Sequence, residues 1–270
     1  MNIHIISTLE QFANMREEWN RLLSESNHLN IFLSWEWLFN WYKIFANSGE
    51  LFILVVRDNN ELVGIVPLIK TKLKFMMVKK IEFLGTSFVY SDYLDFIIKK
   101  NFEKEVIQKV FDFLILNKKY WAVLVLKDMD KDSINSKIIL EQVKEKHIFY
   151  EIKIGTLCPY LDLPNTKDEF LKRLSRDTRH KLLKSERQLI RNYNPTFIQI
   201  KTQEQLQHAL KSMFYLNEKR WQLKSSKGSF FNDKIKMFHS EITKSFLDNG
   251  WLKWEYFDIY DFQVLNRFSH

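Results

Sequence analysis

The chain has 270 residues, 46% of them hydrophobic and 15% aromatic, which excludes a disordered chain and suffices for one large core or two ordinary ones. The net charge of +8 is concentrated in residues 171–191, where eight basic and two acidic side chains give 8 − 2 = +6. A single cysteine, Cys158, excludes an internal disulfide; we expect it to be a small core residue in a reducing compartment.

Membrane insertion and export are not indicated. The longest apolar runs, such as "LFILVV" at 51–56, are far shorter than the roughly 18 residues that a membrane helix needs. The N-terminus "MNIHIISTLEQF" lacks the basic start and apolar stretch of a signal peptide. We therefore predict a cytoplasmic protein without a transmembrane segment.

The first elements alternate between strand and helix. "NIHII" at 2–6 predicts a strand, and Ser7 and Glu10 have capping-box spacing at the start of a helix with apolar residues at helical intervals. Ser34 is placed to cap a second helix, "WEWLFNWYKIF". Its aromatic residues lie on nearly every face, so we expect it to be largely buried or to form a groove wall.

The next hundred residues predict a mixed α/β domain. "LFILVV", the turn "RDNNE" and "LVGIVPLIK" indicate a hairpin, with "IEFLG" and "YLDFII" as further antiparallel strands. A helix at 102–117, a strand at 121–127, a helix from Ser133 to Lys146 and a strand at 149–155 then alternate. The first domain is expected to be residues 1–164.

The second half, residues 165–270, begins with a helix and then partly repeats the first half. Thr166 and Glu169 have capping-box spacing before the basic run. "FIQIKTQEQL" at 197–206 resembles "IHIISTLEQF" at 3–12, and "NGWLKWEYFDIYDFQVL" from Asn249 resembles "SGELFILVVRDNNELVG" from Ser48. Repeated order of this kind predicts an internal duplication.

The second copy is expected to be incomplete. Gly49 is followed by 164 − 49 = 115 residues of its domain, and Gly250 by only 270 − 250 = 20 residues. A two-stranded sheet is marginally stable alone. We therefore expect this half to be a truncated copy that leans on the first domain or is completed by a second chain.

This order of elements resembles the GNAT acyltransferase fold, and more specifically the CelD-type acetyltransferase-like family, tandem GNAT proteins related to the Fem-type aminoacyl transferases. The stretches that carry the resemblance are "NIFLSWEWLFNWYKIF", "LVGIVPLIK" with "FLGTSFVYSDYLDFI", "SRDTRHKLLKSERQL", and "FYLNEKRWQLKSSKGSFF" with "KMFHSEI". The resemblance implies one full GNAT-like domain and a partial second one. It also implies transfer of an acyl group from acetyl-CoA or another acyl-CoA to an amine or hydroxyl, often on cell-envelope polysaccharide.

One family feature is missing. GNAT enzymes usually bind the coenzyme A pyrophosphate at a helix N-terminus after an R/Q-x-x-G-x-G/A loop, where free N–H groups and the helix dipole favour an anion. The six glycines of this chain form no such loop. Either the chain is a shortened, inactive member or a partner completes the donor site.

The stretch "SDYLD" holds the candidate catalytic residues Asp92, Tyr93 and Asp95. A carboxylate here is suited to act as general base toward an acceptor amine or hydroxyl. Three residues apart in a strand, the two carboxylates point to opposite faces, so only one faces a pocket. The alternative is that both are ordinary solvent-exposed acids.

Two groups of residues are candidates for anion binding. Arg176, Arg179 and Lys181 of the basic run suit nucleotide phosphates, an acidic glycan or tRNA, or else form a solvated helix face. Arg220 beside Trp221 suits a carboxylate or phosphate in an aromatic groove, or else Trp221 is core and Arg220 surface. DNA binding is disfavoured because no recognition module flanks the run. The isolated histidines indicate no metal site.

Three functions remain open from the sequence. The first is acyl transfer to a small-molecule or glycan acceptor, and the second is a non-catalytic protein that keeps the fold to bind an anionic glycan or a protein partner. The third is tRNA-dependent aminoacyl transfer, for which binding must weaken steeply with salt.

Overall fold

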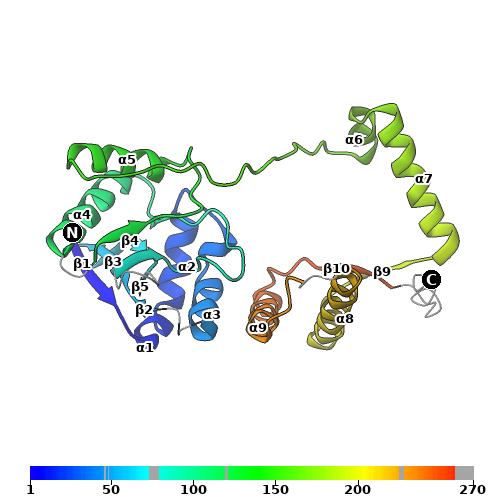
Figure 1. The fold of residues 1–270 in the computed structure, drawn as a ribbon, viewed down its shortest axis with the longest axis horizontal. Helices are drawn as coiled ribbons and strands as arrows, with labels where there is room; N and C mark the ends of the chain where they lie inside the picture. The colour runs from blue at the N-terminus through cyan, green and yellow to red at the C-terminus, as the bar shows by residue number, and fades with distance from the viewer. Residues whose placement is uncertain (46, 48, 73–78, 119–120, 225–227, 259–270) are drawn as a thin grey trace. The chain divides into compact units, whose positions relative to one another are not determined.

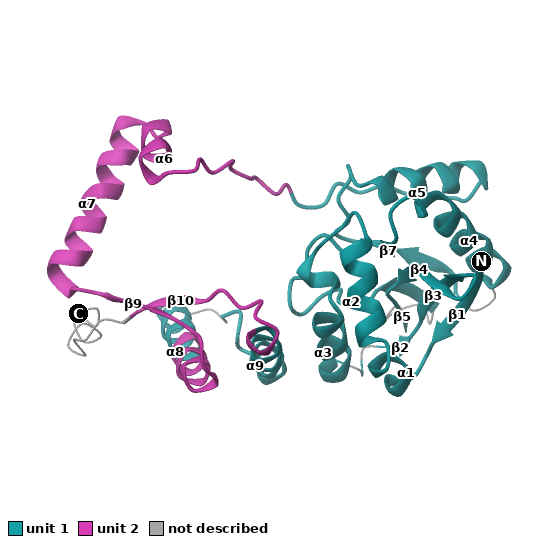
Figure 2. Ribbon diagram, turned by 180° about the vertical axis from the view of Figure 1, so that it is seen from behind, with its two compact units in different colours: residues 1–156, 214–246 teal, residues 157–213, 247–270 magenta. Residues whose placement is uncertain are grey.

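The computed structural model describes residues 1–45, 47, 49–72, 79–118, 121–224 and 228–258. The chain forms two compact units, shown in different colours in Figure 2. Unit 1 comprises residues 1–156 and 214–246, and unit 2 comprises residues 157–213 and 247–270.

Unit 1 starts with a strand and short helices. These are β1 (Asn2–Ile6), α1 (Leu9–Ala13), α2 (Arg16–Glu25), a 3-10 turn η1 (Ile31–Leu33) and α3 (Trp35–Phe45). The expected capping box at Ser7 and Glu10 is wrong by one residue. The cap is Thr8, whose hydroxyl accepts a hydrogen bond from the Gln11 N–H at 3.2 Å, while the Gln11 amide oxygen accepts from the Thr8 N–H at 3.3 Å. The predicted cap at Ser34 is confirmed, since its hydroxyl accepts from the Trp37 N–H at 3.3 Å.

Two four-stranded sheets follow (Figure 1). The strands are β2 (Glu50–Leu51), β3 (Ile53–Asp58), β4 (Glu61–Val66), β5 (Leu68–Lys72), β6 (Lys79–Phe83), β7 (Ile97–Ile98) and β8 (Val123–Val125). Their orders are β1-β3-β4-β7 and β2-β5-β6-β8, antiparallel except for the parallel pair β6–β8. Pro67 separates β4 from β5, and because proline has no N–H to donate, it marks the point where the chain leaves one sheet for the other.

Helices cover both sides of these strands. Figure 1 shows α2 and α3 on one side and α4 (Glu103–Leu116) with α5 (Ile134–Glu145) on the other. Gly64 of β4 lies directly against α4, because a β-carbon at this position would be 2.6 Å from Cγ1 of the fully buried Val106. The glycine thus lets the helix pack closely on the sheet.

One predicted strand is confirmed only at its end, and another is wrong. In "YLDFII" only Ile97 and Ile98 pair with β4, because residues 85–95 form a loop with several left-handed backbone conformations. Residues 149–155 form no strand, and Phe149 and Ile154 are 97% and 90% exposed. Alternation of apolar and polar residues marks a face, but a strand also needs a neighbouring strand for its hydrogen bonds, and none pairs with this segment in the described structure.

The core of unit 1 is built around α3, as its aromatic composition predicts. Trp37, Trp41 and Phe45 are at most 7% exposed. The helix α9 (Asp233–Asp248) adds the fully buried Phe238, whose ring meets that of Trp37 edge-on at 4.8 Å between centroids. Residues from the second half of the chain therefore complete this core.

Unit 2 contains the basic run. Its elements are α6 (Lys167–Arg173), α7 (Arg176–Tyr193), β9 (Thr196–Gln199), the first part of α8 (Gln203–Gln222) and β10 (Glu255–Asp258). The run is two helices and not one, because the Ser175 hydroxyl accepts from the Thr178 N–H at 3.2 Å and starts α7 anew. Cys158 is exposed, so its expected place in a core is wrong.

The strand pairs of the two halves have matching registers. Ile3 of β1 is opposite Val56 of β3, and Phe197 of β9 is opposite Phe257 of β10. The two similar pairs of stretches in the sequence align the same positions: Ile3 with Phe197, and Val56 with Phe257. The Thr8–Gln11 cap also has its counterpart, because the Thr202 hydroxyl accepts from the Gln205 N–H at 3.2 Å. The counterpart of β4 would fall after residue 258, outside the described residues.

Within the described residues, no helix is both long enough and apolar enough to cross a membrane.

Because Val106 leaves no room for a β-carbon at Gly64, the Gly64→Ala variant should lower the free energy of unfolding by about 1–3 kcal/mol. Gly155→Ala is the matched control, since no atom lies within 4 Å of its added β-carbon, and it should change stability by no more than about 0.5 kcal/mol. Urea denaturation of both variants measures the difference. Equal stability of the two variants would contradict the close packing of α4 on β4.

Candidate functional site

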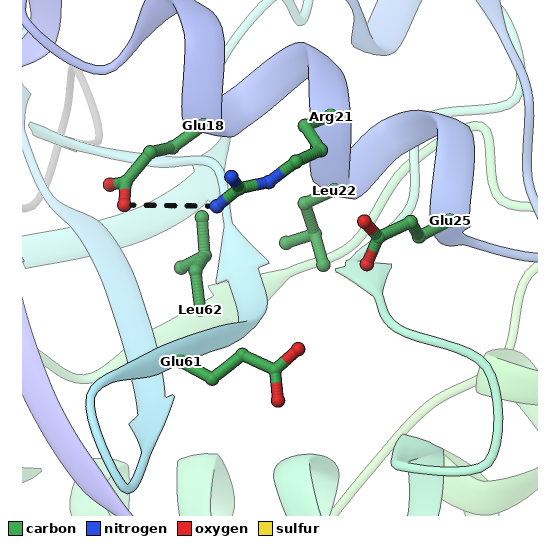
Figure 3. A pocket seen from close by; sticks show the side chains of 6 residues that line it. All are labelled: Glu18, Arg21, Leu22, Glu25, Glu61 and Leu62. Carbon is green, nitrogen blue, oxygen red and sulfur yellow. Dashed lines mark ion pairs between the residues drawn. The ribbon is translucent and has the colours of Figure 1, made fainter.

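A surface hollow of about 320 Å³ in unit 1 is rich in carboxylates but poor in unpaired charge (Figure 3). It is lined by Glu18, Arg21, Leu22, Glu25, Glu61 and Leu62. Arg57 binds Glu18 and is the main cause of the lowered pKa of that carboxyl. Lys99 pairs with both Glu25 and Glu61. The cations of the protein thus already neutralise these acids, which fits a structural ion-pair network.

A second hollow of unit 1, of about 410 Å³, combines polar groups with an apolar rim. The residues that line it are Asn27, His28, Leu29, Asn30, Ile31, Tyr93, Asp95 and Asp130. Ile31 is the first residue of η1, and the others come from three loops: the one after α2, the one before β7 and the one before α5. We call it the Asp95 hollow.

Asp95 is the most deeply buried ionisable group of this hollow, with only 2% of the residue exposed. One carboxylate oxygen, Oδ1, accepts hydrogen bonds from the Phe96 N–H at 2.7 Å and from the Asn135 amide at 3.0 Å. The other, Oδ2, lies 3.5 Å from Nε2 of His28. Both carboxylate oxygens of Asp95 therefore have a polar neighbour within 3.5 Å.

Burial is the main influence on the acidity of Asp95. It raises the pKa of the carboxyl above its usual value, because a charge in a dry environment is disfavoured. The His28 imidazole, and after it the hydrogen bonds from Asn135 and Phe96, lower the pKa and offset part of this effect. A carboxyl of this kind, next to an imidazole in a hollow, is typical of sites that move protons.

The loop that carries Tyr93 and Asp95 is held in an unusual backbone conformation. Ser87, Phe88, Tyr90 and Tyr93 all have positive φ, between 53° and 70°, which costs free energy in residues other than glycine. Hydrogen bonds from neighbouring elements stabilise it: the Asn30 amide donates to the carbonyls of Asp92 and Tyr93 at 3.0 and 2.9 Å. The loop thus positions its side chains by contacts with other elements.

The three predicted catalytic residues are placed differently. Asp92 is exposed and does not line the hollow, whereas Tyr93 and Asp95 both do. Tyr93 is 47% exposed at the rim, and Asp95 is buried at the floor.

The predicted anion-binding residues fall in both units. Arg176, Arg179 and Lys181 belong to α7 in unit 2, a helix without a buried residue. Arg220 and Trp221 belong to the part of α8 in unit 1, with Arg220 exposed and Trp221 half-buried. A β-carbon on Gly228 would be 2.4 Å from Cδ1 of Trp221, so the backbone at Gly228 packs against the indole.

The sequence analysis did not indicate the two residues that contact the Asp95 side chain from other elements: His28, which lines the hollow, and Asn135 of α5, which does not. Asn135 is 1% exposed and donates to both Asp95 and the Phe96 carbonyl. Neither residue has a local signal, because the groups they contact are 67 and 40 residues away in sequence. No group of three or more His, Cys, Asp or Glu side chains suited to a metal ion occurs in the described part of the chain.

The N-terminus of α4 does not suit a phosphate. Glu103 and Glu105 lie in its first turn, and Glu103 is only 6% exposed, with its carboxylate accepting from the Asn27 amide at 2.6 Å. These acids already interact with the positive end of the helix dipole and would repel an anion.

Comparison with known proteins gives weak likenesses only. No family model and no curated protein matches the sequence. Among solved structures, glucosamine-6-phosphate N-acetyltransferase from Arabidopsis thaliana matches 60% of this chain and all of its own, at 12% identity and a TM-score of 0.34. A probable acetyltransferase matches 60% of this chain and all of its own chain, at 10% identity and a TM-score of 0.33. A mutant protein from Thermus thermophilus matches 62% of this chain and all of its own chain, at 12% identity and a TM-score of 0.32. Values of this size establish neither a family nor an activity.

The raised pKa of Asp95 predicts a pH-dependent stability. The fold favours the protonated carboxyl, so its stabilising contribution is complete below the ordinary value of 3.8 and is lost as pH rises through the higher folded pKa. The difference in unfolding free energy between the wild type and Asp95→Asn should therefore fall from about pH 4 upward, by at most about 1.4 kcal/mol per pH unit. Denaturant unfolding at several pH values measures it, with the exposed Asp92→Asn as control. A difference that grows with pH would contradict the raised pKa.

Proposed function

We propose that the chain is a GNAT-like acyltransferase that transfers an acyl group from acyl-CoA to an amine or a hydroxyl. The observation that carries the proposal is the element order of unit 1: a strand, helices, a meander of antiparallel strands, then helix α4, strand β8 and helix α5. This is the order of the fold that the sequence resembles. Fold-level analogy alone does not give a function, so the proposal also rests on the hollow.

The Asp95 hollow supports the chemistry of direct acyl transfer. Such a reaction needs a positioned nucleophile, a base that takes its proton and polarisation of the thioester carbonyl, and it needs no covalent intermediate with the protein. The hollow offers a buried carboxylate and an imidazole at its floor, with Tyr93 at its rim. We propose Asp95 and Tyr93 as site residues, and Asp92 as a peripheral acid outside the hollow.

The donor phosphates require cations, and within unit 2 the helix α7 carries several that are not buried. Arg176 and Arg179 lie in the first two turns of this helix, with Lys181 nearby. The acidic N-terminus of α4 is a poor alternative, because Glu103 and Glu105 occupy it. We propose that the guanidinium groups bind the phosphates of the acyl donor, since arginine forms charge-assisted, bidentate contacts with phosphate oxygens.

The finer description of the fold, one full copy plus a partial second copy, is also a proposal. Its support is the matching register of the pairs β1–β3 and β9–β10, together with the equivalent caps at Thr8 and Thr202. Cell-envelope polysaccharide as the acceptor has no support beyond the sequence resemblance.

The alternative is a non-catalytic protein that uses the basic residues of α7 to bind a different anionic molecule. Because α7 has no buried residue, its basic face is also suited to an anionic glycan or a protein partner. The same face would serve tRNA in an aminoacyl transfer, where a steep loss of binding with salt is the expected signature.

Calorimetric titration of the full chain with acetyl-CoA tests the donor site. We expect micromolar binding that the double variant Arg176→Ala, Arg179→Ala weakens by at least about tenfold, because two charge-assisted contacts are lost. The control is Lys104→Ala, Lys109→Ala, which removes the same charge from exposed positions of α4.

The outcomes separate the alternatives. Equal weakening by both double variants would indicate a general electrostatic effect and not a clamp on α7. Absence of binding at millimolar acetyl-CoA would reject the enzyme and favour the binding protein.

A further inference from the structure

His28 forms a pair with Asp95 that packing alone does not explain. Its Nε2 atom is buried and has no hydrogen-bond partner among the described residues, yet it lies 3.5 Å from Oδ2 of Asp95. An imidazole edge buried beside a carboxylate without a formed hydrogen bond costs stability. Sites of this kind are enriched where a proton is moved.

The carboxylate determines which nitrogen of His28 is available. A carboxylate next to Nε2 favours the tautomer with the proton on Nε2, which leaves Nδ1 as the basic nitrogen. Asp95 is itself fixed by the Phe96 N–H and the Asn135 amide, so it does not rotate freely. The backbone N–H of His28 donates to the Ser26 hydroxyl at 3.2 Å, which restrains the loop that carries it.

The surroundings of the pair indicate the kind of molecule that fits. Leu29, Ile31 and Tyr93, exposed by 80%, 40% and 47%, form an apolar rim around the polar floor. Amide groups of Asn27 and Asn30 also line the hollow. A small organic molecule with a polar end suits this arrangement, because the rim covers its carbon atoms and the floor binds its amine or hydroxyl.

We propose that His28 accepts the proton of a small amine or hydroxyl nucleophile bound in the Asp95 hollow, and that Asp95 is the positioning residue for its imidazole. The inference rests on the proposed acyltransferase function. The nucleophile forms a bond to the acyl carbon, the carbon–sulfur bond breaks, and the thiolate of coenzyme A leaves with the electron pair. The proton of the nucleophile passes to Nδ1 of His28 and from there to the thiolate or to solvent.

Two acidic side chains, Asp95 and Asp130, and the neutral phenol of Tyr93 line the hollow together with His28. Asp95 and Tyr93 come from the loop before β7, and Asp130 comes from the loop before α5. Glu103 of α4 acts through Asn27, to which it is hydrogen-bonded. These carboxylates stabilise the protonated imidazole that forms when the nucleophile loses its proton.

The test uses p-nitrophenyl acetate, an activated ester that does not require the coenzyme A site, with ethanolamine as the nucleophile. Release of p-nitrophenolate by the full-length protein should fall about 100-fold in His28→Gln, the usual contribution of a general base. Added imidazole should restore activity to His28→Ala beyond the rate at which imidazole alone cleaves the ester in buffer. His4→Gln is the control, because it removes an exposed histidine of β1 outside the hollow.

A second measurement examines Asp95 without relying on rate. Nitrogen-15 spectra of the histidines should show His28 with its proton on Nε2 in the wild type and a mixture of tautomers in Asp95→Asn. A purely structural role of Asp95 would leave this ratio unchanged in a folded variant. If Asp95→Asn does not fold, the wild-type tautomer and the His28 variants decide the question.

Each result separates this inference from the function on which it rests. A rate for His28→Gln within about threefold of the wild type, no cleavage above buffer by the wild type, or a wild-type proton on Nδ1 would overturn the role of His28. Cleavage that depends on His28 in a protein that does not bind acetyl-CoA would retain the proton acceptor and reject the acyl-CoA donor.

Discussion

The burial of the Asp95 carboxylate is the constraint on which the candidate site depends. A carboxyl that is 2% exposed must find donors within the protein or remain protonated. Its donors come from Phe96 beside it and from Asn135 of α5, and His28 approaches from the loop after α2. The group therefore joins three segments that are distant in sequence.

Glu36 is a second buried carboxylate, and its partners and surroundings differ from those of Asp95. It is 1% exposed, and its two oxygens accept from Nε of Arg16 at 2.8 Å and from the Asn20 amide at 2.9 Å. Glu36 lines neither of the two hollows described above. Its carboxylate instead joins α3 to α2, because both of its donors belong to α2. The distance from Asp95 to its partner His28 is longer, 3.5 Å, and Asp95 lines a hollow of about 410 Å³. The comparison favours Glu36 as a residue that stabilises the packing of two helices, and it fits the positioning role proposed for Asp95.

Much of the fold could be predicted from local signals, whereas most of the hollow could not. The hairpin of β3 and β4, the helix α4 and the cap at Ser34 follow from turn residues, periodicity and capping chemistry within a few residues. The contact of His28 with Asp95 spans 67 residues and has no periodic signature. The strand predicted at 149–155 was wrong for a related reason, because its pattern is local but a strand depends on a distant partner. The sequence indicated Asp95 as a candidate, and the residues that contact its carboxylate became apparent only in the structure.

The matching registers of the two halves have a consequence for how the chain tolerates insertions. In the first half, Ile6 pairs with Ile53, 47 residues further along the chain. In the second half, the Ile200 N–H donates to the Trp254 carbonyl, 54 residues further along. Loop-closure entropy grows with the logarithm of length, so the seven additional residues cost only about 0.1 kcal/mol. A slip of one residue in the pairing would instead turn every side chain of the strand to the opposite face. Length can therefore drift in the helices between the strands while the pairing itself is kept.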